Sequence, residues 1–250
     1  EQAQYYQIFD HYKTVEFDVG YEVYDYGYRE TVDGAFFMKN EGVYSGPSAS
    51  LAFYPKMEGF GAYLPDMYRL EGRFAFGEVD YTGSGTYNGL SDYMYEVRGL
   101  VGKRFAMEDN SSIAPYLGLG WRYLNDGAEA LPADATTYSG YNRESRYLYA
   151  PVGADYRTAL SDGWKMGINL EYDQLIEGKQ KSHLEDSVDN NGVNPGYQTL
   201  VNKQEQGFGL RGSLRFSRAL TSHARTSLFI EPFYRYWKIR KSEIGISCSS

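Results

Sequence analysis

The feature that most constrains this 250-residue chain is a strict alternation of apolar and polar side chains that recurs along its length. In residues 164–173, WKMGINLEYD, every second residue from Trp164 to Tyr172 is apolar, and those between are glycine or polar. A β-strand directs successive side chains to opposite faces, so this segment has one apolar and one polar face. Two folds accommodate it: a sheet with its polar face in water, or a barrel with its apolar face in lipid.

Nine segments carry this alternation, and no segment shows a 3.6-residue period over the length of a helix. The chain is therefore predicted to be all-β. Pro115, Pro151 and Pro232 fall inside predicted strands and should mark bulges or edge irregularities, because proline cannot donate to a strand ladder. The predicted strands cover residues 15–23, 43–53, 68–76, 93–101, 113–123, 148–156, 164–172, 208–216 and 228–236.

Composition excludes several classes of protein. No apolar run approaches the roughly 18 residues of a spanning helix, whereas alternation leaves a membrane barrel open. Aromatic residues make up 17% of the chain, and tyrosine suits both strands and membrane interfaces. The net charge of -8 argues against a nucleic-acid partner. One cysteine, Cys248, excludes an internal disulfide and a multi-cysteine metal site, so we expect no cofactor and no metal.

Short and long connections alternate between the predicted strands. Compact links follow the fourth, sixth and eighth strands, and long polar loops near residues 125–144 and 177–206 follow the fifth and seventh. The third strand is followed by the Gly-rich stretch TGSGTYNGLSD, residues 82–92. This segregation is typical of outer-membrane barrels, which have short periplasmic turns and long external loops.

The two faces of the strands differ in the residues that they carry. Aromatic residues bracket the apolar stripes, and Trp164 and Tyr172 lie roughly 20 Å apart along the membrane normal of a tilted strand. The bracketing aromatics are Trp121, Tyr123, Trp164, Tyr172, Phe208, Phe216 and Tyr236. The polar face carries acids and bases at mid-strand, and these are predicted to neutralise one another inside a narrow barrel. They include Glu16, Asp18, Glu71, Arg73, Glu96, Arg98, Arg122, Glu171, Asp173, Arg211, Arg215, Glu231 and Arg235.

In these features the chain resembles the outer-membrane β-barrel proteins of Gram-negative bacteria, the group that includes opacity-type and OmpA-like barrels. The resemblance is one of pattern, carried by YMYEVRGLVGKRF (93–105), IAPYLGLGWRY (113–123) and FIEPFYRYW (229–237). It implies an antiparallel up-and-down transmembrane β-barrel in the bacterial outer membrane, monomeric and in contact with lipid and lipopolysaccharide. It also implies the barrel-assembly machinery as a partner, and an external ligand or host surface that meets the loops.

Single-chain barrels of this kind have an even number of strands. We therefore expect ten strands, nine visible and the closing one missing from this sequence, with eight as the alternative. Residues 1–13 are predicted to form a periplasmic N-terminal segment, and residues 14–250 a single barrel domain. The last ten residues, KSEIGISCSS, are then expected to lie in an external loop.

The function expected from the sequence is non-enzymatic: an envelope scaffold, or a barrel whose loops serve recognition or adhesion. One alternative is a narrow solute or ion channel, and another is a soluble ligand-carrying barrel. A third is an outer-membrane hydrolase, either lipid-modifying or of the omptin type, with His183 facing Asp80 and Asp92. The omptin order of Asp and His is absent here, and a solvated loop histidine is the commoner reading of His183.

Overall fold

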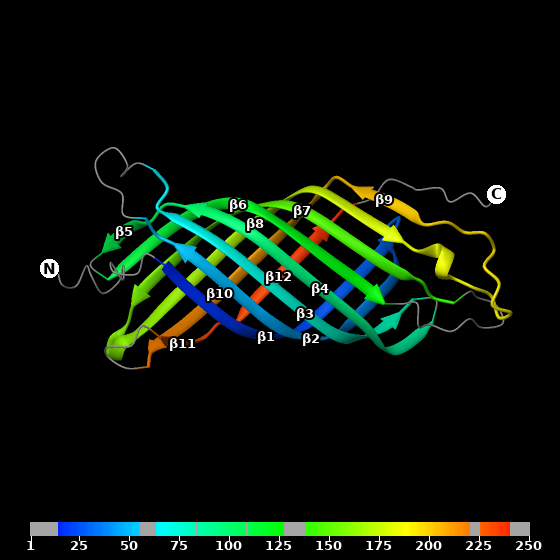
Figure 1. Ribbon diagram of the computed structural model, residues 1–250, viewed down its shortest axis with the longest axis horizontal. Helices are drawn as coiled ribbons and strands as arrows, with labels where there is room; N and C mark the ends of the chain where they lie inside the picture. Colours follow the sequence, from blue (N-terminus) through cyan, green and yellow to red (C-terminus); the bar gives the residue numbers. More distant parts are fainter. Residues whose placement is uncertain are drawn as a thin grey trace.

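The computed structural model describes residues 15–55, 64–83, 85–108, 110–127, 139–220 and 226–240. These residues form one antiparallel up-and-down sheet, which is curled into a half-barrel (Figure 1). The prediction of an all-β fold is confirmed. The strands are β1 (Val15–Val32), β2 (Ala35–Phe53), β3 (Met67–Thr82), β4 (Thr86–Gly102), β5 (Phe105–Glu108), β6 (Ser111–Gly127), β7 (Asn142–Ala159), β8 (Trp164–Ser182), β9 (Leu200–Gln204), β10 (Gly207–Ala219), β11 (Ser227–Ile230) and β12 (Phe233–Ile239).

The twelve strands occupy nine positions around the curve, because the short strands continue longer ones. β5 pairs with β6 just beyond the end of β4, β9 pairs with β8 ahead of β10, and β11 and β12 pair with successive parts of β10. Pro232 separates β11 from β12, as expected of a residue that cannot donate to a ladder. The nine positions correspond to the nine segments predicted from the alternation.

The strands run further than the alternation indicated, so several expected connections were too long. β1 and β2 meet in a two-residue turn, Asp33 and Gly34, both with positive φ (50° and 83°). β3 and β4 extend through most of residues 82–92, which were expected to be a connection. Strand pairing also continues into the flanks of the loops predicted near 125–144 and 177–206: β6 extends to Gly127 and β7 begins at Asn142, and β8 extends to Ser182 and β9 begins at Leu200.

We call the end where β1, β3, β6 and β8 finish the loop end, and the other the turn end. Two 3₁₀ turns, η3 (Ser161–Gly163) and η4 (Leu184–Asp186), lie at the turn end and the loop end respectively. None of the helices in the described residues is long and apolar enough to cross a membrane.

The curl gives the sheet a concave and a convex face with different side chains. Along β1 the even-numbered side chains are partly covered, and the odd-numbered ones are exposed. The covered side is the concave one, because its side chains contact strands that are not sheet neighbours, as Arg98 of β4 does with Glu171 of β8. Two apolar clusters lie among these concave residues. One contains Tyr44, Ala75, Val79, Leu90, Met94 and Leu124, and the other Ala52, Tyr54, Met67, Leu100, Ala114 and Tyr116.

The two edges of the sheet are β1 and the β11–β12 pair, and no backbone pairing joins them within the described residues. Side chains reach across the gap instead: the rings of Tyr24 and Phe233 lie 5.6 Å apart, and Arg215 of β10 contacts Asp18 of β1. The predicted N-terminal segment, residues 1–13, and the expected final loop, KSEIGISCSS, lie outside the described residues.

Candidate functional site

Buried ion pairs form a layer across the middle of the concave face. Glu171 of β8 contacts Arg98 of β4 at 2.5 Å and Arg211 of β10 at 3.2 Å, and Arg211 also contacts Glu96 at 2.7 Å. Tyr116 of β6 donates a 2.6 Å hydrogen bond to Glu171. The side chains of Glu171 and Glu96 are almost fully covered. This arrangement, which we call the central layer, joins four strands and leaves the carboxylates neutralised by guanidinium groups.

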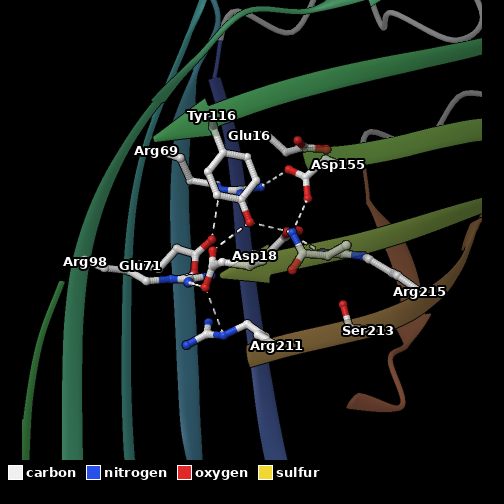
Figure 2. Close-up of polar contacts among 12 residues, drawn as sticks. Glu16, Asp18, Arg69, Glu71, Arg98, Tyr116, Asp155, Arg211, Ser213 and Arg215 are labelled. Carbon is white, nitrogen blue, oxygen red and sulfur yellow. Dashed lines mark hydrogen bonds and ion pairs between the residues drawn. The ribbon is translucent and has the colours of Figure 1, made fainter. Parts of the chain in front are cut away.

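A second group extends the central layer toward the turn end (Figure 2). Arg69 lies 2.8 Å from both Glu71 and Asp155, and Glu71 also contacts Arg98 of the central layer. Asn169 donates hydrogen bonds of 2.7 Å to Asp155 and to the hydroxyl of Tyr116. The polar side chains therefore form one continuous network. Within it, the hydrogen bonds donated by Asn169 satisfy acceptors that the ion pairs leave open.

A third group lies beside the open edges of the sheet. Arg215 contacts Asp18 at 2.9 Å and Glu231 at 3.8 Å, and Ser213 donates to Glu231. Glu22 lies 3.3 Å from Arg73 and 3.7 Å from Arg235. Glu16 accepts hydrogen bonds from Tyr54 and Arg157. Two of these contacts, Arg215 with Asp18 and Arg235 with Glu22, link β1 to strands on the far side of the gap.

The structure brings most of the charges predicted for the polar face into these contacts. Arg122 lies directly opposite Glu96 in the β4–β6 register, with its guanidinium 5.9 Å from the Trp237 ring. Asp173 is buried, and its Oδ1 accepts no hydrogen bond from the described residues. Asp155, which contacts Arg69 and Asn169, was not among the predicted charges of the polar face. The contact with Arg69 depends on the curl of the sheet, which no local pattern reveals.

A cavity of about 840 Å³ lies on the concave face beside the open edges. Its wall includes consecutive residues of β1 from Asp18 to Val23, and consecutive residues from Ser227 to Phe233. Since consecutive residues point to opposite faces of a strand, the cavity reaches the gap between β1 and β11–β12.

The aromatic residues predicted to bracket the apolar stripes lie on the convex face. Tyr172 and Phe208 stack at 6.0 Å, and Phe208 lies 6.2 Å from Tyr236, which makes a row across β8, β10 and β12. Trp121 and Tyr123 contact Tyr95 of β4 at 5.3 and 4.8 Å. Trp164 packs under the guanidinium of Arg218 at the turn end, and Phe216 pairs with Met166 and Ile230.

The three residues of the hydrolase alternative do not meet. His183 contacts Glu144 at 3.5 Å and Glu185 at 3.1 Å. Asp92 is buried on the concave face, where it accepts hydrogen bonds from Tyr44 and from Gly127 N–H. Asp80 is exposed on the convex side of β3 and accepts from Gly89 N–H. The two aspartates lie on either side of the β3–β4 connection, but within the strands, because β3 extends to Thr82 and β4 begins at Thr86.

The loop at residues 183–199 is held by its own polar side chains. The amide of Asn194 donates to the carbonyls of Leu184, Glu185 and Ser187, and its oxygen accepts from Gly196 and Tyr197 N–H. Hydrogen bonds from Val193 N–H and Asn191 N–H lower the pKa of the Asp189 carboxyl. Ser187 donates to Ser139, which ties this loop to the segment before β7. The loop therefore presents a defined surface.

Within the described parts of the chain, no group of three or more His, Cys, Asp or Glu side chains is arranged to hold a metal ion. The chain matches no protein family, and no curated protein is significantly similar to it.

Proposed function

We propose that this chain is a β-barrel of the bacterial outer membrane, of the opacity-type and OmpA-like kind, with a non-enzymatic role. Its concave face would be the lumen, and its convex face would contact outer-membrane lipid and lipopolysaccharide. It would act as an envelope scaffold that presents its loops for recognition or adhesion to an external ligand or host surface. The barrel-assembly machinery would insert it, as a monomer.

The observation that carries the proposal is the inverted distribution of the side chains. The convex apolar residues of β1, from Val15 to Val23, are each 53–66% exposed, while the concave face holds the charges. Soluble monomers rarely expose an apolar patch larger than a few hundred Å². Other exposed apolar side chains on this face are Leu51, Leu70, Phe76, Val97, Leu117, Leu119, Val152, Leu170, Leu210, Leu228 and Ile230.

The proposed barrel has ten strands. Nine antiparallel positions leave β1 and β12 running in the same direction, so that an antiparallel ladder between them needs one more strand. An even number of strands is also the rule for bacterial single-chain barrels.

A scaffold fits better than a channel because of the central layer. Arg98, Glu171 and Arg211 join opposite walls by ion pairs, and their side chains would occupy the middle of the lumen. The cavity of about 840 Å³ favours a channel as the second candidate, because it leaves part of the interior open.

The proposal is tested by folding the chain with and without detergent and comparing gel mobility before and after boiling. A membrane barrel should fold only in detergent or lipid and should shift in mobility when boiled, because its strand ladder resists the gel detergent until heated. A protein that folds as a monomer in plain buffer would contradict the membrane assignment, since its convex apolar face would then have to be buried in another way.

A further inference from the structure

The cavity beside the open edges lies in the turn-end half of the concave face. It extends from the central layer, where Glu96, Arg98 and Arg211 line it, to Glu16 and Arg157 near the turn end. The side chains of Glu16 and Arg157 are 32% and 45% exposed. Figure 2 shows part of this wall, in which Arg69 contacts Asp155. The cavity is therefore accessible near the turn end.

On the loop-end side of the cavity, the concave face is filled by apolar side chains. Tyr24 packs against the cluster that contains Tyr44 and Met94, and its ring lies 5.6 Å from that of Phe233, which lines the cavity. The described residues thus leave the turn end as the side from which a solute can enter.

The charges of the cavity wall are balanced, but its hydrogen bonds are not. Carboxylates and guanidinium groups line the cavity in equal number, seven of each. None of the described wall residues has a buried side-chain oxygen without a hydrogen-bond donor. In contrast, buried N–H groups of Arg69, Arg73, Arg211 and Arg235 have no hydrogen-bond acceptor. The wall therefore lacks acceptors rather than donors.

The open donors of Arg73 and Arg235 have the fewest alternatives. The Nε atoms of Arg69 and Arg211 each lie within 3.2 Å of a carboxylate oxygen. Arg73 Nε, Arg235 Nε and Arg235 Nη1 accept no such partner, although the Arg73 side chain is only 8% exposed. The two arginines share one carboxylate, Glu22, at 3.3 and 3.7 Å. Because a buried N–H without an acceptor costs free energy, these three donors point to a ligand that supplies acceptors.

A phosphate group matches these donors better than a carboxylate does. It has three strong acceptor oxygens and a charge of about −1.5 to −2 at neutral pH, whereas a carboxylate has two oxygens and a single charge. The cavity of about 840 Å³ also has room for more than a phosphate group, and it falls in the range of small-molecule sites, roughly 300–1,000 Å³.

We propose that this cavity binds a small phosphate monoester, whose phosphate oxygens accept hydrogen bonds from Arg73 and Arg235 in competition with Glu22. The side chains come from β3, β12 and β1, so the site depends on the curl that brings the two edges of the sheet together. In the proposed membrane barrel, the solute would enter from the periplasm. That direction of entry rests on the proposed function, whereas the site itself does not.

The test is calorimetric titration of the full-length protein, refolded in detergent, with glycerol phosphate. Arg235→Gln should raise the Kd at least about tenfold, because a charged hydrogen-bond partner is lost. Glu22 keeps its contact with Arg73 in this variant. Glu22→Gln should lower the Kd about tenfold, because the competing carboxylate is removed. Damage to the fold would weaken binding in both variants, so the opposite signs identify the site.

A matched control lies on the convex face. Arg146 also contacts a single glutamate, Glu144, at 2.9 Å, and Arg146→Gln should change the Kd less than about twofold. An equal loss of affinity in Arg146→Gln and Arg235→Gln would overturn the proposal, since binding would then follow net charge alone.

Inorganic phosphate is titrated in parallel to identify the source of the phosphate group. Weaker binding of inorganic phosphate than of glycerol phosphate would support a monoester, because the rest of the cavity would contact its organic part. Equal affinities would overturn the monoester and assign the site to free phosphate.

The heat-dependent gel shift separates this inference from the proposed function. A protein that keeps the shift but binds glycerol phosphate without saturation would overturn the site and leave the barrel intact. Saturable binding that Arg235→Gln weakens, in a protein that folds as a monomer in plain buffer, would support the site and contradict the membrane barrel.

Discussion

At the scale of single residues, the distinguishing feature of this chain is a set of charged side chains buried on the concave face of the sheet. Glu171 and Glu96 are covered almost completely, yet each has guanidinium partners from other strands. Removing one member of a buried pair leaves an uncompensated charge, whereas an exposed pair contributes little. The central layer therefore gives the first prediction.

Glu171→Ala should lower the free energy of unfolding in detergent by about 3–5 kcal/mol, because Arg98 and Arg211 would both lose a buried carboxylate. Urea titration followed by gel mobility measures this change. The matched control is Lys39→Ala, which breaks an exposed pair with Glu41 and should cost less than about 1 kcal/mol. Equal costs for the two variants would show that the central layer is not a buried charge network.

The loop at 183–199 gives a prediction about pH. Two backbone N–H groups, of Val193 and Asn191, hold the pKa of Asp189 below its usual range, so their bonds stabilise the loop above the unfolded pKa of roughly 4. That stabilisation should be lost as the pH falls through the lowered native pKa. Hydrogen exchange at these two amides should therefore show protection at pH 6 that weakens below about pH 4. Asp189→Asn should remove most of this pH dependence, and an unchanged profile in that variant would contradict the assignment.

At the scale of strands, two tyrosines close over glycines of the neighbouring strand. Tyr149 of β7 lies directly opposite Gly120 of β6, and its ring occupies the place that a Cβ on Gly120 would need. Tyr116 and Gly153 form the reciprocal pair between the same two strands. These contacts fix how β6 and β7 pack on the concave face.

Gly120→Ala should destabilise the protein by about 1–3 kcal/mol, because the Tyr149 ring would have to leave its site. Gly99→Ala is the control, since no atom lies within 4 Å of the corresponding Cβ position, and it should change stability by less than about 0.5 kcal/mol. Thermal unfolding in detergent compares the two. A smaller effect at Gly120 than at Gly99 would exclude this packing.

Strands were the part of the fold that the sequence predicted best. Alternation located all nine positions, because a half-covered strand needs a two-residue period whatever its partners. It missed the strand ends near Asp33 and Gly34, although the dipeptide Asp-Gly is itself a hairpin signal.

The contact of Arg98 with Glu171 could not be predicted from the alternation, because β4 and β8 approach each other only when the sheet curls. The burial of Asp92 was missed for the same reason, since a Gly-rich stretch indicates a loop until strand pairing is known.

At the scale of the whole molecule, the central layer leads to a prediction about the proposed membrane barrel. In planar bilayers that barrel should show much smaller conductance than an open porin, because the ion pairs of Glu171 with Arg98 and Arg211 cross the concave face. The double variant Arg98→Ala, Glu171→Ala should raise conductance severalfold. A large conductance in the unsubstituted protein would favour the channel over the scaffold.

The central claim is that the convex face meets lipid and the concave face does not, and the three tryptophans measure it. Trp121 and Trp164 are exposed on the convex face, whereas Trp237 packs against Tyr149 on the concave face. Each is kept singly, with phenylalanine at the other two positions, and the protein is reconstituted in vesicles of brominated lipid. Fluorescence of Trp121 and Trp164 should be strongly quenched and that of Trp237 scarcely at all. Quenching of Trp237 alone, or of none of the three, would contradict the account.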